Sequence, residues 1–266
     1  MKTVPLALIL CTTSILPVNA ALISHYTFEN SGNLGLDTTG NANTNTSIGA
    51  PSQSTTNLPG NGTGSGALQL NGTSSLAADN NFTADLSVYT VSLWVKIDNP
   101  LIGGTQSIIS TRESAGGLLL WAGGGNGTDT NSNFRLNHYS NDGNSNQNRQ
   151  LQSGVEVTNT WTHVAVTYDG TTARFYINGV AGTTSTDMAL GAGSSDDIGI
   201  GMRSPSNTGN TMSAGQLDDV GIWDNALSAS EIQNIYDNGV GSYVPEPSSA
   251  LLLGLGGLSL LIKRRR

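Results

Sequence analysis

Apolar and polar residues alternate in short runs along most of the chain, a pattern that predicts β-strands with one buried face. The clearest run is YTVSLWVKI at 89–97, in which Val91, Leu93, Val95 and Ile97 share one face. Comparable runs lie at 22–28, 67–72, 107–110, 118–121, 134–139, 198–202 and 216–223. The chain is therefore expected to consist mainly of short strands.

Turn signals separate these runs. The stretch WTHVAVTYDGTTARFYINGV at 161–180 contains two alternating runs on either side of Asp169-Gly170, which predicts a β-hairpin. A second turn is expected at Asn178-Gly179, and a loop rich in Gly and Asn is expected from about residue 30 to 66.

Only residues 228–238, SASEIQNIYDN, have the pattern of a helix. Ser228 is a candidate N-cap with Glu231 three residues later, and Gly239 follows the end of the segment. Many short strands and turns with one short C-terminal helix predict an all-β fold, a two-sheet antiparallel sandwich or jelly roll. The residues from 21 to 243 suit one such domain.

The expected domain is strongly acidic. Between residues 21 and 243 there are eighteen Asp or Glu and six Lys or Arg, so the formal charge is −12 with histidine neutral. Nucleic acid is not expected as a partner, because phosphate binding needs clustered cations. The charge favours divalent cations and is compatible with neutral sugars.

The first twenty residues, MKTVPLALILCTTSILPVNA, have the parts of a secretory signal peptide: Lys2, an apolar stretch, and small residues before a cut. Cleavage is expected after Ala20, which would leave the chain without its one cysteine, Cys11. A lipoprotein cut before Cys11 is the alternative, but Leu10 is larger than such a cut requires. An exported chain without a disulfide depends on its hydrophobic core or on a metal.

The last segment, VPEPSSALLLGLGGLSLLIKRRR at 244–266, joins Pro245, Glu246 and Pro247 to an apolar run and a basic end. The run, expected to be helical at about 248–262, is shorter than the roughly 20 residues that span a bilayer. These parts in this order resemble the PEP-CTERM signal of Gram-negative bacteria. The resemblance implies an exported protein of the cell surface or exopolysaccharide matrix, processed by an exosortase-type sorting enzyme. A plain C-terminal membrane anchor is the alternative.

The domain itself also resembles a known family. WTHVAVTYDGTTARFYINGV, followed by GQLDDVGIWDNALSASEIQNIY at 215–236, is similar to the LamG-like jellyroll domain of the concanavalin A-like lectin/glucanase superfamily. HYTFENSGNLGLDTTGN at 25–41, GALQLNGTSSL and YTVSLWVKI fit the same family in the same order. The resemblance spans nearly the whole domain and implies two antiparallel sheets, one of them concave.

Two adjacent carboxylates lie on the late strand. Asp218 has the same parity as Val220 and Ile222, so its side chain is expected to point into the core. A buried carboxylate needs compensation. Asp219 points the other way in this register and is expected on the surface.

The resemblance implies that calcium supplies this compensation, as a structural ion between the late strand and the loop after the first strand. The candidate ligands are Asp218, Glu29 and Asp37. The alternative is that Asp218 caps backbone amides and Glu29 is solvated. The histidines are widely separated along the chain, so no zinc site is expected, and His163 is expected to be packed in the fold.

Four residues are candidate contacts for carbohydrate: Trp121, Arg135, Asn137 and Tyr139. Residues 135, 137 and 139 share one face of a strand, and sugar sites combine an aromatic ring with amide or guanidinium groups. The interleaved residues, expected in the core, are Phe134, Leu136 and His138. The alternative is an ordinary polar outer face.

Catalysis is not expected. Glycosidases need two carboxylates close together on one face, and the adjacent pairs Asp196-Asp197 and Asp218-Asp219 point to opposite faces of a strand. The sequence also contains no G-x-S-x-G motif. The sequence therefore predicts an exported protein whose jellyroll domain binds polysaccharide or another extracellular partner. The alternatives are a glycan-cleaving hydrolase of the same superfamily and a passive structural or adhesion component of the matrix.

Overall fold

The computed structural model describes residues 20–41, 43–61, 64–78, 86–100, 105–111, 116–123, 132–141, 146–190, 198–204, 207–212 and 214–243. The expected signal peptide up to residue 19 and the expected sorting tail at 244–266 lie outside the described residues. Both large sheets, the helix and the two hydrophobic clusters are built from residues between Ala20 and Tyr243.

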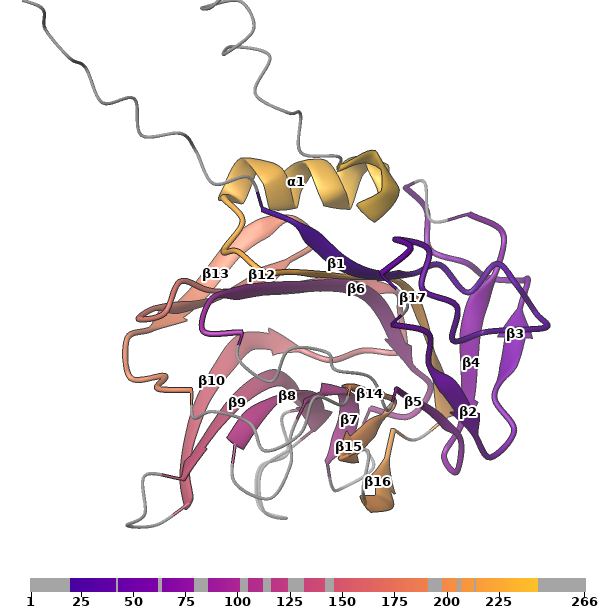
Figure 1. The fold of residues 1–266 in the computed structure, drawn as a ribbon, viewed down its shortest axis with the longest axis horizontal. Helices are drawn as coiled ribbons and strands as arrows, with labels where there is room; N and C mark the ends of the chain where they lie inside the picture. The colour runs from indigo at the N-terminus through magenta and orange to yellow at the C-terminus, as the bar shows by residue number, and fades with distance from the viewer. Residues whose placement is uncertain are drawn as a thin grey trace, which may run out of the picture.

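The described strands form two large antiparallel sheets packed face to face (Figure 1). Sheet A has the order β13-β12-β11-β6-β17-β4-β3, and β1 also pairs with β17. Its strands are β1 (Leu22–Tyr26), β3 (Ser52–Ser54), β4 (Ala67–Asn71), β6 (Tyr89–Ile97), β11 (Thr162–Tyr168), β12 (Ala173–Ile177), β13 (Val180–Ser185) and β17 (Ala214–Trp223). The expectation of a two-sheet antiparallel sandwich with one short C-terminal helix is confirmed.

Sheet B has the order β10-β9-β8-β7-β14-β5-β2, so β10 and β2 are at opposite edges. Its strands are β2 (Thr46–Ile48), β5 (Ser75–Ala78), β7 (Gln106–Ser110), β8 (Gly116–Gly123), β9 (Asn133–Asn141), β10 (Asn146–Glu156) and β14 (Ile198–Ile200). A separate pair joins β15 (Met202–Ser204) to β16 (Asn207–Thr211).

Local sequence explains the best-defined hairpins. Between β11 and β12, the Asp169 carboxylate accepts hydrogen bonds from the backbone amides of Thr171 and Thr172, and Gly170 has a φ of 92°. Between β12 and β13, Asn178 and Gly179 both have positive φ, which matches the right-handed twist of the strands they join. Both predicted turns are thus present.

The main hydrophobic cluster fills the space between the sheets. The alternating residues of β6 that were expected to share a face, Val91, Leu93, Val95 and Ile97, are all at most 1% exposed and belong to it. The other face of sheet A is covered by helix α1 (Ala229–Asn238) and the short 3₁₀ helix η1 (Val240–Ser242) (Figure 1).

Helix α1 has the predicted capping box. The Ser228 hydroxyl accepts from the backbone amide of Glu231, and the Glu231 carboxylate accepts from the backbone amide of Ser228. Ile232 and Ile235 are buried against sheet A in a second cluster that includes Trp223. Both faces of the central strands of sheet A, β6, β11 and β17, are therefore buried, whereas sheet B has no described helix on its outer face.

Candidate functional site

The four candidate carbohydrate residues lie together on the outer face of sheet B. In the register of β8 and β9, Trp121 is opposite Arg135, and Asn137 is two residues further along β9. The interleaved Phe134, Leu136 and His138 are at most 1% exposed on the core side, as expected.

Hydrogen bonds join these side chains into one array. The indole Nε1 of Trp121 donates to Oδ1 of Asn137 over 3.0 Å, and Nδ2 of Asn137 donates to the Tyr139 hydroxyl over 3.2 Å. The guanidinium carbon of Arg135 lies 5.2 Å from the centre of the Trp121 ring, within the range of a cation–π contact. Arg135 Nε also donates to the carbonyl oxygen of Gly123.

The array continues onto β10 through two residues that were not predicted. Oε1 of Gln150 accepts from Arg135 Nη1 over 3.0 Å, and Nε2 of Gln150 donates to Oδ1 of Asn137 over 3.1 Å. Gln152 Nε2 in turn donates to Gln150 over 3.3 Å. They lie in the polar run QNRQLQ at 147–152, which has no strand alternation in the sequence but pairs with β9 in the structure.

Exposure divides the array in two. Trp121 is 6% exposed, and Arg135 and Asn137 are each 3% exposed, so little of their surface is open to a ligand. Gln150 and Gln152 are exposed, and Tyr139 is half-buried. In this arrangement the buried indole, guanidinium and amide groups hold the exposed amides in place from below.

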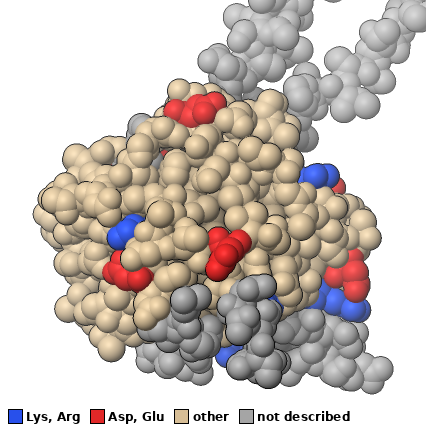
Figure 2. Space-filling view, turned by 180° about the vertical axis from the view of Figure 1, so that it is seen from behind, with Lys and Arg blue, Asp and Glu red and all other residues tan. Residues whose placement is uncertain are grey.

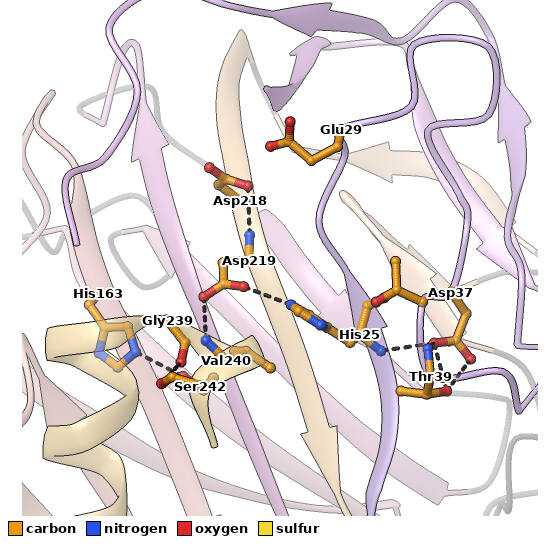
Figure 3. Close-up of polar contacts among 12 residues, drawn as sticks. His25, Glu29, Asp37, Thr39, His163, Asp218, Asp219, Gly239, Val240 and Ser242 are labelled. Atoms are coloured by element: carbon orange, nitrogen blue, oxygen red, sulfur yellow. Dashed lines mark hydrogen bonds and ion pairs between the residues drawn. The ribbon is translucent and has the colours of Figure 1, made fainter. Parts of the chain in front are cut away.

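The three candidate calcium ligands are not brought together. Strand β1 separates Asp218 from Asp37, since β17 with Asp218 pairs along one edge of β1 and Asp37 bridges to Tyr26 at the other edge (Figure 3). Among the described residues, no group of three or more His, Cys, Asp or Glu side chains is placed to hold a metal ion.

Each of these carboxylates instead accepts hydrogen bonds. Asp37 is 6% exposed and accepts from the backbone amides of His25, Thr39 and Asn43. Its two oxygens close the loop after β1.

The other two carboxylates also bind backbone amides. Glu29 is exposed and accepts from the backbone amides of Ser65 and Gly66, just before β4. Asp218 is fully buried and accepts from the backbone amide of Asp219 over 2.8 Å. The residues present do not fit a single calcium site built from all three of these carboxylates.

The expectation for Asp219 was wrong. The residue is 5% exposed, and its Oδ1 lies 2.7 Å from His25 Nε2, while its Oδ2 accepts from the backbone amide of Val240 over 2.7 Å (Figure 3). The parity argument assumed an uninterrupted strand with an exposed outer face. In the structure the register shifts between Asp218 and Gly221, Asp219 has a φ of 47°, and η1 covers that face.

The other two histidines are packed in the fold. Burial lowers the pKa of His138 to about 4, although the carbonyl oxygen of Met188 acts to raise it. Burial also lowers the pKa of His163 to about 4, with Asp219 acting in the opposite direction. The packing role expected for His163 is confirmed, since it is 1% exposed and lies against Trp94.

The sorting residues Pro245, Glu246 and Pro247 lie outside the described residues. Within the described part of the chain, no helix has the length and apolar character needed to cross a membrane.

Comparison with known proteins explains this tail. Residues 244–266 match the model of the PEP-CTERM protein-sorting motif. The motif implies exosortase-mediated sorting, export, and association with the cell envelope of a Gram-negative bacterium.

Solved structures share the fold. One similar structure is domain 4 of AbnA, a GH43 extracellular arabinanase from Geobacillus stearothermophilus, in complex with arabinotriose; identity is 22%, the TM-score is 0.64, and the match covers 82% of this chain and 99% of that one. Another is the binding domain of botulinum neurotoxin serotype D, at 16% identity and a TM-score of 0.57, covering 82% of this chain and 51% of that one. This chain thus spans about half the length of the neurotoxin domain, and at these identities the likeness shows the fold alone.

A search of curated proteins found no match. The model of the concanavalin A-like lectin/glucanases superfamily, however, matches residues 62–233, which is more than half of the chain. The two sheets and these matches lead to one conclusion: the chain belongs to the concanavalin A-like lectin/glucanase superfamily and carries a PEP-CTERM sorting tail.

Proposed function

We propose that this protein is an exported, envelope-associated carbohydrate-binding protein and not a hydrolase. The observation that carries the proposal is the array on the outer face of sheet B. There, the exposed amide of Gln150 is held by buried Arg135 and Asn137, and the exposed amide of Gln152 donates to Gln150. Amide groups fixed in advance pair with sugar hydroxyls at a low cost in side-chain entropy.

The surface chemistry supports a neutral ligand. On the face shown in Figure 2, charged side chains are scattered over a surface that is mostly uncharged. The structural neighbour from the arabinanase was solved with arabinotriose, a neutral oligosaccharide. Tyr139, half-buried beside Asn137, offers an aromatic ring at the edge of the array.

Binding is favoured over hydrolysis by the chemistry of the array. Its described side chains are an indole, a guanidinium, a phenol and three amides, and none of them is a carboxyl group: Trp121, Arg135, Tyr139, Asn137, Gln150 and Gln152. A glycosidase needs two carboxyl groups beside the scissile bond.

The test is affinity electrophoresis of residues 21–243 through gels containing arabinan, cellulose derivatives, starch or mannan. We expect retardation in at least one gel. The double variant Gln150→Ala, Gln152→Ala should lose it, and Gln233→Ala on α1 should keep it. If the double variant is retarded as strongly as the unmodified domain, the binding site lies away from the array. If no gel retards the unmodified domain, the result counts against carbohydrate binding.

A further inference from the structure

A second feature, separate from the outer-face array, is a pocket formed by the loop after β1 and the segment around β2. Its volume is about 480 Å³. Ligand sites for small molecules commonly have volumes of about 300–1,000 Å³. The segments that line the pocket, residues 31–34 and 44–51, are in the indigo and purple part of the chain (Figure 1).

The lining has the chemistry of a site for a neutral polyol. Hydroxyl and amide side chains come from Ser31, Asn33, Thr46 and Ser47, and no described residue that lines the pocket is charged. Apolar surface comes from lining residues that include Pro51. Hydroxyls and amides can both donate to and accept from sugar hydroxyls, while apolar groups suit the C–H face of a sugar ring.

Both walls are held rigidly. The backbone amide of Asn45 donates to the carbonyl oxygen of Gly35 over 2.7 Å, and a Cβ on Gly35 would lie 2.0 Å from the Asn45 carbonyl oxygen. Only glycine permits this close contact between the two segments. Leu34 anchors the first segment in the core, and Asp37 closes its loop through the amides already described.

The second wall is fixed through β2. This strand pairs with β5 in sheet B, and Gly49 then turns the chain with a φ of 69° beside the carbonyl oxygen of Thr73. The pocket is thus formed by ordered backbone on both sides, which keeps the entropy cost of binding low.

Asn45 belongs to the ordered wall of the pocket. It is 3% exposed, and the Tyr26 hydroxyl, which donates to the carbonyl oxygen of Asn43 over 2.7 Å, lies beside its side-chain amide. The hydroxyl and amide groups open to a ligand are those of the exposed lining residues Ser31, Asn33, Thr46 and Ser47.

We propose that this pocket is a saccharide site that binds one unit of a neutral glycan. An anionic ligand is disfavoured because the lining carries no cation and the domain from 21 to 243 has a formal charge of −12. The proposal does not depend on the outer-face array, and each site has its own test.

The positions of the two sites make the protein bivalent if both bind. Gln150 and Gln152 are on β10 and the pocket adjoins β2, at opposite edges of sheet B. Seven strands give six steps of about 4.8 Å, so the sites are roughly 29 Å apart along the sheet. A trisaccharide cannot reach both, so occupation of both would join two glycan segments and raise avidity without any new contact.

The experiment is a nuclear magnetic resonance titration of ¹⁵N-labelled residues 21–243 with neutral trisaccharides of arabinose, glucose, mannose and galactose. With at least one of them we expect shifts that map to 31–34 and 44–51. Ala50→Trp fills the pocket from an exposed lining position, and it should weaken binding by at least about tenfold. Ala181→Trp, at an exposed alanine on β13, is the matched control and should bind as the unmodified chain does.

Three results would overturn the proposal. Shifts that survive Ala50→Trp, or shifts that map only to β8–β10, would place the saccharide elsewhere and leave the proposed function standing. Absence of shifts with every trisaccharide would remove the pocket site. In that case retardation in polysaccharide gels that depends on Gln150 and Gln152 would still support the outer-face array.

Discussion

Mild acid should destabilise this domain through two buried histidines. The Nδ1 atom of His138 lies 2.7 Å from the carbonyl oxygen of Met188, so Nδ1 carries the proton. Its Nε2 atom lies 2.6 Å from the Tyr89 hydroxyl and accepts from it. His163 pairs through Nε2 with the Ser92 hydroxyl over 2.8 Å. Both rings are therefore packed as neutral groups, with pKa values lowered by burial to about 4.

The sign and size of the effect follow from the two pKa values. In the unfolded chain each histidine has a pKa of 6.5. Between 6.5 and about 4 the unfolded state binds more protons than the folded state, so stability falls as the pH falls through this window. At about pH 5 each histidine should lower the free energy of unfolding by about 2 kcal/mol, and the two together should lower it by roughly 4 kcal/mol. The total free energy of unfolding of a native protein is about 5–15 kcal/mol, so this loss is a large part of it.

The assay is urea unfolding of residues 21–243 at about pH 7 and about pH 5. His138→Gln and His163→Gln should each lower stability at neutral pH by loss of packing. Each should also reduce the difference in unfolding free energy between about pH 7 and about pH 5 by about 2 kcal/mol. Equal stability of the unmodified domain at both pH values would refute the reasoning, and so would a double variant that keeps the full acid sensitivity.

Four further predictions address the carboxylates, the array and the tail. Asp219→Asn should lower stability by about 2–4 kcal/mol, because it removes the charge opposite His25 while asparagine tolerates the left-handed backbone; an unchanged melting temperature would contradict this. Trp121→Ala should lower both glycan binding and, by about 3–5 kcal/mol, stability; loss of binding without loss of stability would mean that the indole contacts the sugar directly. Chelation with EDTA should leave the melting temperature unchanged, since the three candidate ligands do not meet; a fall that Asp218→Asn removes would restore the calcium site. Mass spectrometry of the mature protein from its native envelope should find a chain ending near Pro247, and an intact basic end would leave only the membrane anchor.

The sequence predicted the central strands well because their pattern is local. In β6 and β11, apolar residues alternate over the whole strand, and the turn at Asp169-Gly170 has its own chemistry. Strand β10 was not predicted from the sequence, because NQNRQLQSGVE has few apolar residues. Leu151 of this strand packs in the main hydrophobic cluster. Such a strand forms because an edge of the sheet is available for pairing, which no local pattern reveals.

The candidate array shows the same limit. Parity correctly placed Arg135, Asn137 and Tyr139 on one face, because alternation along a strand is fixed by geometry. Parity could not show that Arg135 and Asn137 are buried, nor that Gln150 is their partner, since both depend on the pairing of β9 with β10. Under the proposed function the expected roles change: buried Arg135 and Asn137 would position Gln150, and the exposed glutamines would contact the glycan.

The fold also relates the sorting tail to the binding surfaces. The two described ends meet on the outer side of sheet A, where the backbone amide of Ala21 donates to Asp224 over 2.8 Å and the Tyr243 ring packs against Trp223. Helix α1 lies on this same side, and sheet B is the opposite layer (Figure 1). Before the tail is processed, membrane insertion of the segment that follows Tyr243 would therefore hold the domain by the side of sheet A. The outer face of sheet B, with Gln150 and Gln152, would then point away from the membrane, where it is open to a glycan partner.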